Sequence, residues 1–391
     1  MKGITQVKRI FISTGEVSGD LQGALLITAL KKEAIKRNIE IEISALGGDR
    51  MEKAGAKIIA NTLTIGSMGI LESVPYILPT IKVQNQAKKY LKENHTDLAI
   101  LVDYMGPNLG MGSYLKKHLS HIPVVYYIAP QVWVWSLDGK DTKTIINISD
   151  KILSIFPEEY NYFHKNGANV SWVGHPLVDR MKNAPSKEMA REKLGIKSTE
   201  IAIALLSASR KQEIKYLLPN IFTAAKQIQS KLENVHFWLP LSLENYREDL
   251  EKAIKKYDLK ATIIKNSLEV LPAMDLAITK SGTVNLELAL LNVPQVVVYR
   301  VNPVTAWIAE NILKFSIQYM SPVNLVLMRP VVPEFLQYYA TVENIVNNGL
   351  ELLLNEEKRA KTLADYEEMR GKLGSEGVCD RAAKEIIDFL L

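Results

Sequence analysis

The chain has 391 residues, which is long enough for two domains of ordinary size, each with its own hydrophobic core. Hydrophobic residues make up 47% of the chain and charged residues 23%, so the composition excludes a disordered or fibrous protein. The formal net charge of +5 suits an anionic substrate or an anionic membrane surface, although a surface charged for solubility explains it equally well. Because this excess is modest, we expect no nucleic-acid partner.

The cysteine and histidine content indicates the compartment and the metal chemistry. Cys379 is the single cysteine, so no internal disulfide can form and a reducing compartment is the default. The apolar run at residues 10–12 is too short for a signal peptide, and no stretch approaches the roughly 20 apolar residues of a membrane span. We therefore expect a cytoplasmic location, which includes the surface of a membrane. The six histidines show no metal-ligand spacing, so we expect no metal site.

Short apolar runs alternate with helical patterns along the chain, which is typical of buried parallel strands joined by helices. A polar stretch at residues 180–199 divides these runs into two series. We therefore expect an α/β protein with two Rossmann-like domains, residues 1–185 and 186–354, whose parallel sheets face each other across a cleft. A helical segment, residues 355–391, can pack back on the first domain. The expected strands are residues 8–13, 41–46, 97–102, 122–128, 151–156, 201–206, 235–239, 261–264, 275–279 and 295–299.

The motif "GEVSGD" follows the first expected strand and precedes a helical pattern. Ligands of such sheets lie beyond the carboxyl ends of the strands, so this loop is a candidate site. Gly15 and Gly19 allow a ligand to approach the backbone closely, and Ser18 or Asp20 can cap the next helix. Glu16 stands where a dinucleotide-binding loop has its second glycine, and an ordinary turn explains the motif equally well.

Asp103 ends the buried run "LAILV" at the side of the sheet where ligands bind. A carboxylate there can act as a general base that takes the proton from an attacking hydroxyl group. The structural alternatives are a helix cap and a carboxylate paired with a nearby cation.

Two turns in the second half are candidate phosphate sites. In "LLSASRKQEI", Arg210 opens a helix, where backbone N–H groups and a guanidinium can hold a phosphate. The turn "SGT" at Ser281–Thr283 also follows a strand, and Glu287 lies one helical turn further on, where a carboxylate can bind ribose hydroxyls. Both turns are also common connections between a strand and a helix.

The segment "YYIAPQVWVWS" contains Trp133 and Trp135, which can line a groove for an acceptor or a lipid. Core packing is the more frequent role of such aromatic residues. His175, in "VGHPL", is likewise more often a structural residue of a turn than a catalyst.

Eight motifs, taken together, resemble those of one family. In chain order they are "TGEVSGDLQGALL", "ALGGDRMEKAG", "IGSMGILESV", "IAPQVWVWS", "WVGHPLVD", "ASRKQEI", "SGTVNLELAL" and "PVNLVLMRPVVPEFLQ". This series resembles the lipid-A-disaccharide synthases, which are inverting glycosyltransferases of the GT-B type, and it covers about residues 8–337. No single motif is decisive, but the whole series in this order is specific.

The resemblance implies a reaction and a location. UDP-2,3-diacylglucosamine would donate its sugar to 2,3-diacylglucosamine 1-phosphate, forming a β-1,6 linkage and releasing UDP. Such enzymes need no metal or other cofactor. They work at the cytoplasmic face of the inner membrane as peripheral proteins, and a homodimer is compatible with the resemblance.

The resemblance also assigns roles in the first domain. Asp103 would be the general base for the 6-hydroxyl of the acceptor, and Glu16 would assist it or bind acceptor hydroxyls. Attack from the face opposite UDP would invert the anomeric carbon. The acceptor loop would comprise Gly15, Ser18, Gly19 and Asp20.

In the second domain, the resemblance implies a UDP site. Glu287 would hold the ribose, and Asn324 matches a polar family position near the nucleotide. Positive groups at the departing diphosphate would replace the metal that other glycosyltransferases use. The phosphates would face Ser209, Arg210, Ser281, Gly282 and Thr283.

Three positions depart from the family pattern. Gly106 replaces a second acidic residue, Ser136 replaces an arginine and Ala208 replaces a glycine. These changes bear on acceptor specificity more than on the fold or the donor. A related GT-B UDP-sugar transferase, a UDP-GlcNAc epimerase and a non-catalytic nucleotide-binding or membrane-surface protein are the alternative functions.

Membrane contact is expected in the first domain. Residues 65–81 are apolar enough to take up acyl chains, and a buried helix explains them equally well. The segment "TAWIAENILKF" in the second half is a weaker candidate.

Overall fold

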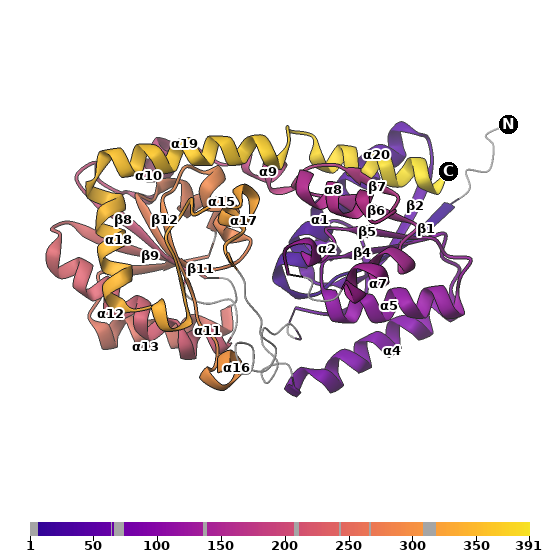
Figure 1. Cartoon of the computed structure of the whole chain (residues 1–391), viewed down its shortest axis with the longest axis horizontal. Coiled ribbons are helices and arrows are strands. Elements are labelled where there is room, and N and C mark those ends of the chain that lie inside the picture. Colours follow the sequence, from indigo (N-terminus) through magenta and orange to yellow (C-terminus); the bar gives the residue numbers. More distant parts are fainter. Residues whose placement is uncertain are drawn as a thin grey trace. The chain divides into compact units, whose positions relative to one another are not determined.

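The computed structural model describes residues 7–63, 65, 74–135, 139–206, 211–241, 244–265, 267–307 and 318–391. The chain forms two compact units: Met1–Asp179 together with Leu373–Leu391, and Arg180–Lys372 (Figure 1). The division at Asp179 lies near the expected boundary at residue 185. The chain returns to the first unit at Leu373, which lies inside the expected C-terminal segment.

The first unit is built on a seven-stranded parallel sheet in the order β3-β2-β1-β4-β5-β6-β7. The central strand β4 is buried along its whole length, which explains its uninterrupted apolar sequence. The edge strands β3 and β7 are only half-buried. The strands are β1 (Val7–Ser13), β2 (Glu40–Gly47), β3 (Lys57–Asn61), β4 (Leu98–Val102), β5 (Val124–Tyr127), β6 (Lys151–Ser154) and β7 (Val170–Trp172).

Helices cover both faces of this sheet. Phe11, Tyr126 and Phe163 are fully buried in the core between them. The helices are α1 (Glu16–Lys36), α2 (Asp49–Lys53), η1 (Val74–Tyr76), α4 (Ile77–Glu93), α5 (Met105–His118), α6 (Val132–Trp135), α7 (Lys140–Ile148), α8 (Pro157–Lys165), α20 (Val378–Leu390) and, at the boundary, α9 (Leu177–Met181).

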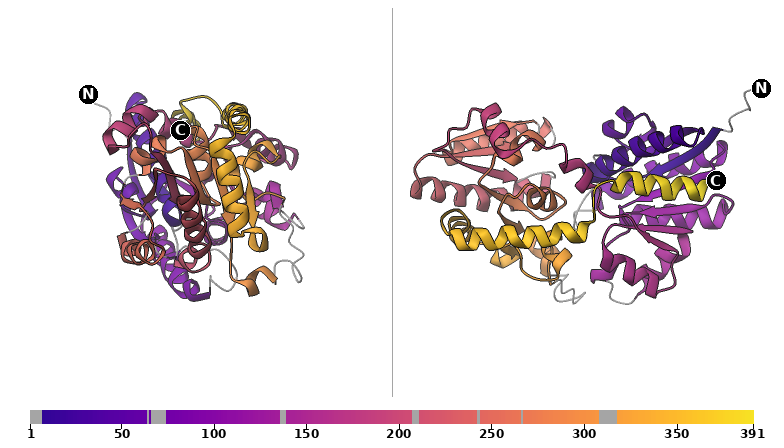
Figure 2. Two further views of the ribbon diagram at one scale, coloured as in Figure 1. Left: turned by 90° about the vertical axis from the view of Figure 1, so that its left-hand side faces the viewer. Right: turned by 90° about the horizontal axis from the view of Figure 1, so that it is seen from above.

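The C-terminal helix α20 packs along α1 in the first unit (Figure 2). Ion pairs fix its register, because Lys32 contacts Asp380 at 2.6 Å and Arg37 contacts Asp388 at 2.6 Å. The carboxylate of Asp179 accepts hydrogen bonds from backbone N–H groups at the start of this helix, at 2.6 and 2.7 Å. A carboxylate at that position is favourable because the helix dipole is positive there.

The second unit has a six-stranded parallel sheet in the order β10-β9-β8-β11-β12-β13. One face packs mainly on α12 and α18, and the other packs on α10, α15 and the η3 segment. The strands are β8 (Ile201–Leu206), β9 (Val235–Pro240), β10 (Ala261–Ile264), β11 (Leu276–Lys280), β12 (Gln295–Tyr299) and β13 (Glu334–Leu336).

Among the helices of the second unit, α10 precedes β8, and the others lie between these strands or after the last one. They are α10 (Lys187–Leu194), α11 (Lys211–Tyr216), α12 (Leu218–Lys231), η2 (Glu244–Tyr246), α13 (Arg247–Tyr257), α14 (Ser267–Val270), η3 (Leu271–Ala273), α15 (Val284–Leu290), α16 (Pro303–Trp307), α17 (Pro322–Leu327), η5 (Gln337–Tyr339), α18 (Val342–Leu354) and α19 (Glu356–Leu373).

Each sheet has one point where the strand order reverses. In the first unit, β1 pairs with β2 on one side and β4 on the other. In the second unit, β8 pairs with β9 and β11 in the same way. Parallel sheets bind ligands beyond the carboxyl ends of the strands at such points. The fold therefore selects the residues that follow β1 and β4, and those that follow β8 and β11.

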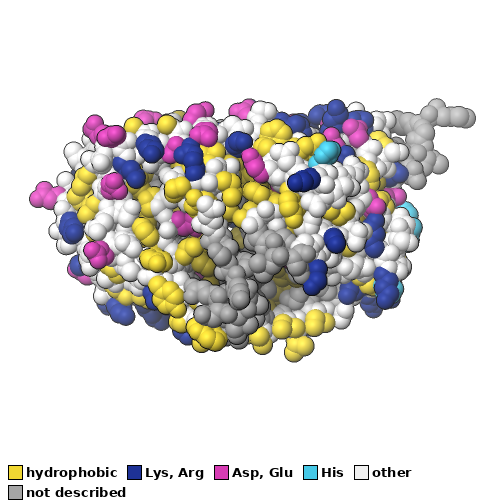
Figure 3. Space-filling view, viewed as in Figure 1, with side chains coloured by type: hydrophobic (Ala, Val, Ile, Leu, Met, Phe, Trp, Pro, Cys, Tyr) yellow, Lys and Arg dark blue, Asp and Glu magenta, His cyan; other side chains and the backbone are white. Residues whose placement is uncertain are grey.

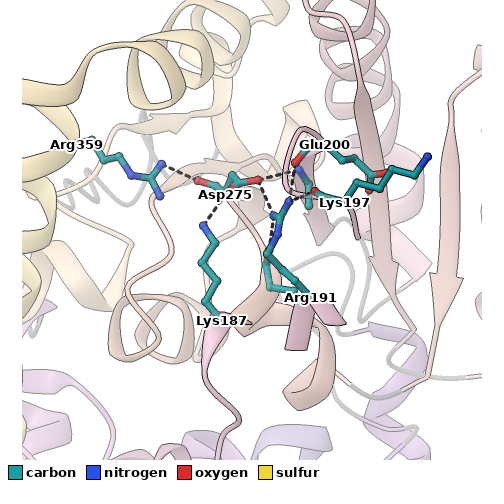
Figure 4. Close-up of polar contacts among 8 residues, drawn as sticks. Lys187, Arg191, Lys197, Glu200, Asp275 and Arg359 are labelled. Atoms are coloured by element: carbon teal, nitrogen blue, oxygen red, sulfur yellow. Dashed lines mark hydrogen bonds and ion pairs between the residues drawn. The ribbon is translucent and has the colours of Figure 1, made fainter. Parts of the chain in front are cut away.

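Asp275 anchors the opposite, amino end of the second sheet (Figure 4). Its carboxylate accepts hydrogen bonds from Lys187 at 2.6 Å, from Arg191 at 3.1 Å and from the N–H of Ala202 at 2.9 Å. Arg359 donates to its backbone carbonyl at 3.1 Å. This single aspartate thus joins α10, α19 and the start of β8 to β11.

No helix in the described part of the chain combines the length and the apolar character that crossing a bilayer requires.

Asp275→Asn is expected to destabilise the second unit by about 2 kcal/mol at pH 7, because two cations lose their shared anion. Burial opposes ionisation, but the hydrogen bonds from Lys187 and Ala202 and the charges of Lys187 and Arg191 lower the pKa of Asp275 below its ordinary value. The stabilisation is therefore fully present above about pH 4 and is lost as the pH falls through the lowered pKa. Urea unfolding at pH 7 and pH 3 should show a difference between wild type and variant that shrinks in acid.

The matched control is Glu248→Gln on α13, since the Glu248–Lys252 pair is exposed and should contribute little at either pH. Equal stability of wild type and Asp275→Asn at pH 7 would contradict the anchoring role.

Candidate active site

The first candidate site begins where β1 ends. Gly15 is the N-cap of α1, which starts at Glu16 without a side-chain cap. A methyl group on Gly15 would collide with the ring of Tyr104, and one on Gly19 would collide with the hydroxyl of Thr14. Close packing within the first unit therefore requires glycine at both positions. The side chain of Glu16 lies outside the described residues, and Ser18 is half-buried.

Asp20 is 2% exposed and binds the backbone of a neighbouring helix. Its carboxylate accepts hydrogen bonds from the N–H groups of Gly48 at 2.8 Å, Arg50 at 3.1 Å and Met51 at 3.1 Å. It caps α2, which begins at Asp49. Asp20 belongs to the expected acceptor loop, and its role in the fold is to bind the N–H groups at the start of α2.

Asp103 lies directly after β4 on a strained turn, and its side chain is exposed. Asp103 and Tyr104 have φ of 49° and 53°, and Ile128 at the end of β5 has φ of 57°. Left-handed backbone is uncommon for residues other than glycine and unfavourable for a β-branched residue. The N–H of Asp103 donates to the carbonyl of Ile128 at 3.2 Å, and this hydrogen bond joins the two strained turns.

Asn108 of α5 is fully buried and joins the ends of β1 and β4. Its side-chain oxygen accepts a hydrogen bond from the hydroxyl of Ser13 at 2.7 Å. Its amide nitrogen lies 3.2 Å from the carbonyl of Ser13, 3.0 Å from that of Val102 and 2.8 Å from that of Asp103. Asn108 therefore fixes the position of Asp103 relative to the loop that starts α1. The motif "VDYMGPN" contains this residue, but sequence alone did not single it out.

The second candidate site lies after β11, at Ser281–Thr283. The hydroxyl of Ser281 donates to the carbonyl of Met320 at 2.7 Å, and the N–H of Gly282 donates to the side-chain oxygen of Asn285 at 2.9 Å. Thr283 is half-buried and precedes the first residue of α15. The side chains of Ser281 and Asn285 therefore fix the conformation of this turn. Ser209 and Arg210, expected to face the same phosphates, lie outside the described residues.

Glu287 is 7% exposed and forms an ion pair with Arg180. Both residues belong to the second unit. A buried carboxylate needs such a partner, because an unpaired charge out of water is costly. The pair fixes the orientation of Glu287 one helical turn after Thr283. Arg180 ends the stretch "GHPLVDR", and the sequence analysis did not select it.

Asn324 is 1% exposed and supports the loop that reaches Ser281. Its side-chain oxygen accepts from the N–H groups of Val331 and Val332, and its amide donates to the carboxylate of Glu334 at 2.9 Å. Glu334 in turn accepts from the N–H groups of residues 320 and 321. Burial raises the pKa of Glu334 above its usual value. Asn324 has backbone and side-chain partners for both of its polar atoms, so its visible role is to position this loop.

His175 is a neutral, buried turn residue. Its Nδ1 accepts a hydrogen bond from the N–H of Leu177 at 3.2 Å, and burial lowers its pKa to about 3. The ring of Phe156 lies against it with a centroid separation of 5.6 Å, and the ring of Trp133 lies 6.2 Å from Phe156. Trp133 is half-buried in this aromatic group, and the side chain of Trp135 lies outside the described residues.

Among the described residues there is no group of three or more histidine, cysteine, aspartate or glutamate side chains that could hold a metal ion.

The arrangement can be compared with known proteins. A family model described as lipid-A-disaccharide synthetase matches residues 10–387. The chain belongs to the lipid-A-disaccharide synthase family. It is therefore a glycosyltransferase of lipid A biosynthesis, as the motif series predicted.

Curated relatives match over nearly their whole length. The lipid-A-disaccharide synthase of Gloeothece citriformis is 57% identical over 383 residues, covering 98% of this chain and 100% of the relative. That of Synechocystis is 53% identical over 384 residues, covering 97% of this chain and 98% of the relative.

Solved structures confirm the predicted fold class of two parallel α/β sheets. The UDP-GlcNAc 2-epimerase of Neisseria meningitidis, solved with UDP-GlcNAc, matches with a TM-score of 0.65 over 98% of this chain and 99% of that chain. The epimerase of Methanocaldococcus jannaschii, solved with UDP-GlcNAc and UDP, matches with a TM-score of 0.57 over 98% and 99%. These proteins are 12% and 16% identical to this chain, so the likeness establishes the GT-B-like fold alone.

Asn108→Leu keeps the side-chain volume but removes the four hydrogen bonds by which Asn108 joins the end of β1 to the end of β4 and the Asp103 turn. We expect the first unit to lose about 3 kcal/mol of stability, since several buried backbone carbonyls lose their partner. We expect transferase activity to fall about a hundredfold, because small displacements of catalytic groups are costly. Thermal unfolding and transfer rates measured side by side check both effects.

Asn94→Leu is the control, because Asn94 is an exposed asparagine that binds only the carbonyl of Tyr90. The role assigned to Asn108 is wrong if its leucine variant keeps wild-type stability and rate.

Proposed function

We propose that this chain transfers the acylated glucosamine of UDP-2,3-diacylglucosamine to the 6-hydroxyl of 2,3-diacylglucosamine 1-phosphate. The products are the β-1,6 disaccharide 1-phosphate and UDP. Family membership supports the substrates. The observation that carries the chemistry is the exposed carboxylate of Asp103, held on a strained turn where the strand order of the first sheet reverses.

Asp103 is the general base of the proposal. Its carboxylate takes the proton from the 6-hydroxyl of the acceptor as that oxygen bonds to the anomeric carbon of the donor sugar. The bond between the anomeric carbon and the β-phosphate oxygen breaks, and its electron pair leaves with UDP. Attack opposite the leaving group inverts the anomeric centre. Glu16, with Gly15 and Ser18 beside it, binds acceptor hydroxyls or assists the base.

The second unit binds UDP. The diphosphate faces Ser209 and Arg210 together with the Ser281–Thr283 turn, after which α15 begins. Glu287, fixed by Arg180, accepts hydrogen bonds from the ribose. The two epimerases of similar fold are solved with UDP-sugars, which supports a nucleotide site in this fold. Positive side chains and helix N–H groups stabilise the charge that develops on the diphosphate, so the proposal needs no metal.

The first unit carries an exposed apolar surface that we assign to the inner membrane. On η1 and α4, Val74 is 58% exposed, Ile77 50%, Leu78 77% and Ile81 48%. Figure 3 shows hydrophobic side chains gathered at the lower edge, where Figure 1 places the start of α4. Such a patch indicates a membrane or protein surface, and acylated substrates favour the membrane. Exposed lysines at 82 and 89, further along α4, suit anionic headgroups.

The double variant Ile77→Ser/Leu78→Ser is expected to weaken binding to vesicles of phosphatidylethanolamine and phosphatidylglycerol at least about tenfold, because two apolar side chains lose their burial in lipid. Co-sedimentation measures the binding. The control is Ile35→Ser on α1, an isoleucine of the same unit that is 80% exposed. Unchanged vesicle binding of the double variant, or an equal loss of binding in the control, would show that this surface does not bind the membrane.

Asp103→Asn is expected to lower transfer by about 10²–10⁴-fold while UDP affinity stays at the wild-type value, because only proton removal is lost. Product formation and calorimetry with UDP measure the two quantities. Asp249→Asn, at an exposed position on α13, is the control and should leave both unchanged. Near-wild-type turnover of Asp103→Asn would show that another group is the base.

A further inference from the structure

Arg50 is an exposed arginine beside the loop that starts α1. It belongs to the motif "ALGGDRMEKAG", one of the eight that carry the family resemblance, and no role has been assigned to it so far. Arg50 is the second residue of α2, and its guanidinium donates a hydrogen bond to the carbonyl of Val17, in the first turn of α1, at 3.3 Å. Within the ranges that the structure describes, this is the one hydrogen bond of the Arg50 side chain, and it forms no ion pair. Since a guanidinium has five N–H donors, most of them are available to a ligand.

Buried contacts on either side of Arg50 fix α2 within the first unit. The carboxylate of Asp20 accepts hydrogen bonds from three N–H groups at the start of α2, including that of Arg50. The side chain of Met51 is fully buried and packs closely on Gly23 of α1 and Gly47 of β2, where an added methyl group would collide with its sulfur. These N–H groups are therefore used within the protein, and the guanidinium is the group that this turn offers to a ligand.

The order of the strands puts Arg50 and Asp103 on opposite sides of the acceptor loop. Ser13, at the end of β1, is paired with Leu46 of β2 on one side and with Leu101 of β4 on the other. The acceptor loop follows β1, α2 follows β2, and Asp103 follows β4. Neighbouring strands lie about 4.8 Å apart, so the ends of β2 and β4 are separated by about 10 Å. The three strand ends thus carry, in order, an arginine, the acceptor loop and an aspartate.

This order suits the acceptor of the proposed function. Besides the attacking 6-hydroxyl, 2,3-diacylglucosamine 1-phosphate carries a phosphate monoester on its anomeric carbon. Such a group bears about −1.5 to −2 charges at pH 7, and a guanidinium binds it through two parallel hydrogen bonds. The separation of about 10 Å between the strand ends is on the scale of one monosaccharide with a hydrogen bond on each side. With the 6-hydroxyl at Asp103, a sugar that lies across the end of β1 has its phosphate on the side of Arg50.

We propose that Arg50 binds the 1-phosphate of the acceptor and thereby selects an anionic acceptor. Its guanidinium holds two phosphate oxygens, while the carbonyl of Val17 and the backbone hydrogen bond to Asp20 hold the arginine in place. The bound phosphate orients the sugar so that the 6-hydroxyl meets the base. This inference rests on the proposed function, which supplies the acceptor and its base. The competing account is that Arg50 only stabilises the first turn of α1 through Val17.

An acceptor without the phosphate separates the two accounts. The transfer assay, in micelles of a neutral detergent, compares 2,3-diacylglucosamine 1-phosphate with 2,3-diacylglucosamine. The micelles contain no phospholipid, so a lipid headgroup cannot cause a difference. We expect wild type to prefer the phosphorylated acceptor about tenfold to hundredfold in kcat/KM, the range of a charge-assisted hydrogen-bonded pair. In Arg50→Met, the KM of the phosphorylated acceptor should rise by about that factor, and the KM values of the other acceptor and of the UDP-sugar should stay unchanged.

Arg50→Gln is the second variant, because its amide can still donate to the carbonyl of Val17 but carries no charge. It should lose the preference for the phosphorylated acceptor as Arg50→Met does. Thermal unfolding identifies any variant that fails to fold. The matched control is Arg9→Met, since Arg9 is an exposed arginine towards the amino end of β1 that pairs with Glu42 at 2.9 Å. This control removes one positive charge from the same unit and should leave the preference unchanged.

The outcomes distinguish this inference from the proposed function. An equal loss with both acceptors would show that Arg50 has only a structural role, and an undiminished preference in a folded Arg50 variant would exclude it from the phosphate. A wild-type chain that uses both acceptors equally well overturns the inference alone, because the proposed reaction still takes place. A wild-type chain that makes no disaccharide from the phosphorylated acceptor overturns the proposed function and, with it, this inference.

Discussion

Buried backbone groups at the carboxyl ends of the central strands are the constraint on which both units depend. At these ends the sheet ladder stops, so each buried polar group needs another partner, such as a side chain. A fully buried asparagine provides one in each unit: Asn108 in the first and Asn285 in the second. Asn285 accepts from the N–H of Gly282 at 2.9 Å and donates to the carbonyl of Lys280 at 3.0 Å. The amide side chain suits this task because it both donates and accepts.

This constraint separates residues that shape the turns from residues that can act on a ligand. Asp20, Asn324 and Asp275 bind backbone groups in the protein, and Asp103 is an exposed residue on a strained turn. Strain persists where surrounding contacts enforce it, and here Asn108 and Tyr126 bind the backbone of that turn. The chemistry proposed for Asp103 thus relies on the side chains that hold its backbone.

The sequence predicted most of the fold, because buried parallel strands have uninterrupted apolar sequences. Strands β3, β7 and β13 were not predicted, because these three strands are half-buried and their sequences mix apolar with polar residues. For the candidate site, the motifs lie after β1, β4, β8 and β11, the strands at which the order of each sheet reverses. Asn108 and Arg180 were not predicted because their partners lie far away in the sequence, at Ser13 and Glu287. The backbone partners of Asp20 and Asn324 could not be predicted for the same reason.

The most direct test of the account is the reaction itself. Purified protein is incubated with UDP-2,3-diacylglucosamine and 2,3-diacylglucosamine 1-phosphate, with and without EDTA, and the disaccharide and UDP are quantified. The account predicts equal amounts of disaccharide and UDP in both cases, at the same rate. Absence of disaccharide in both cases would contradict the proposed substrates, and product only without EDTA would contradict the metal-free mechanism.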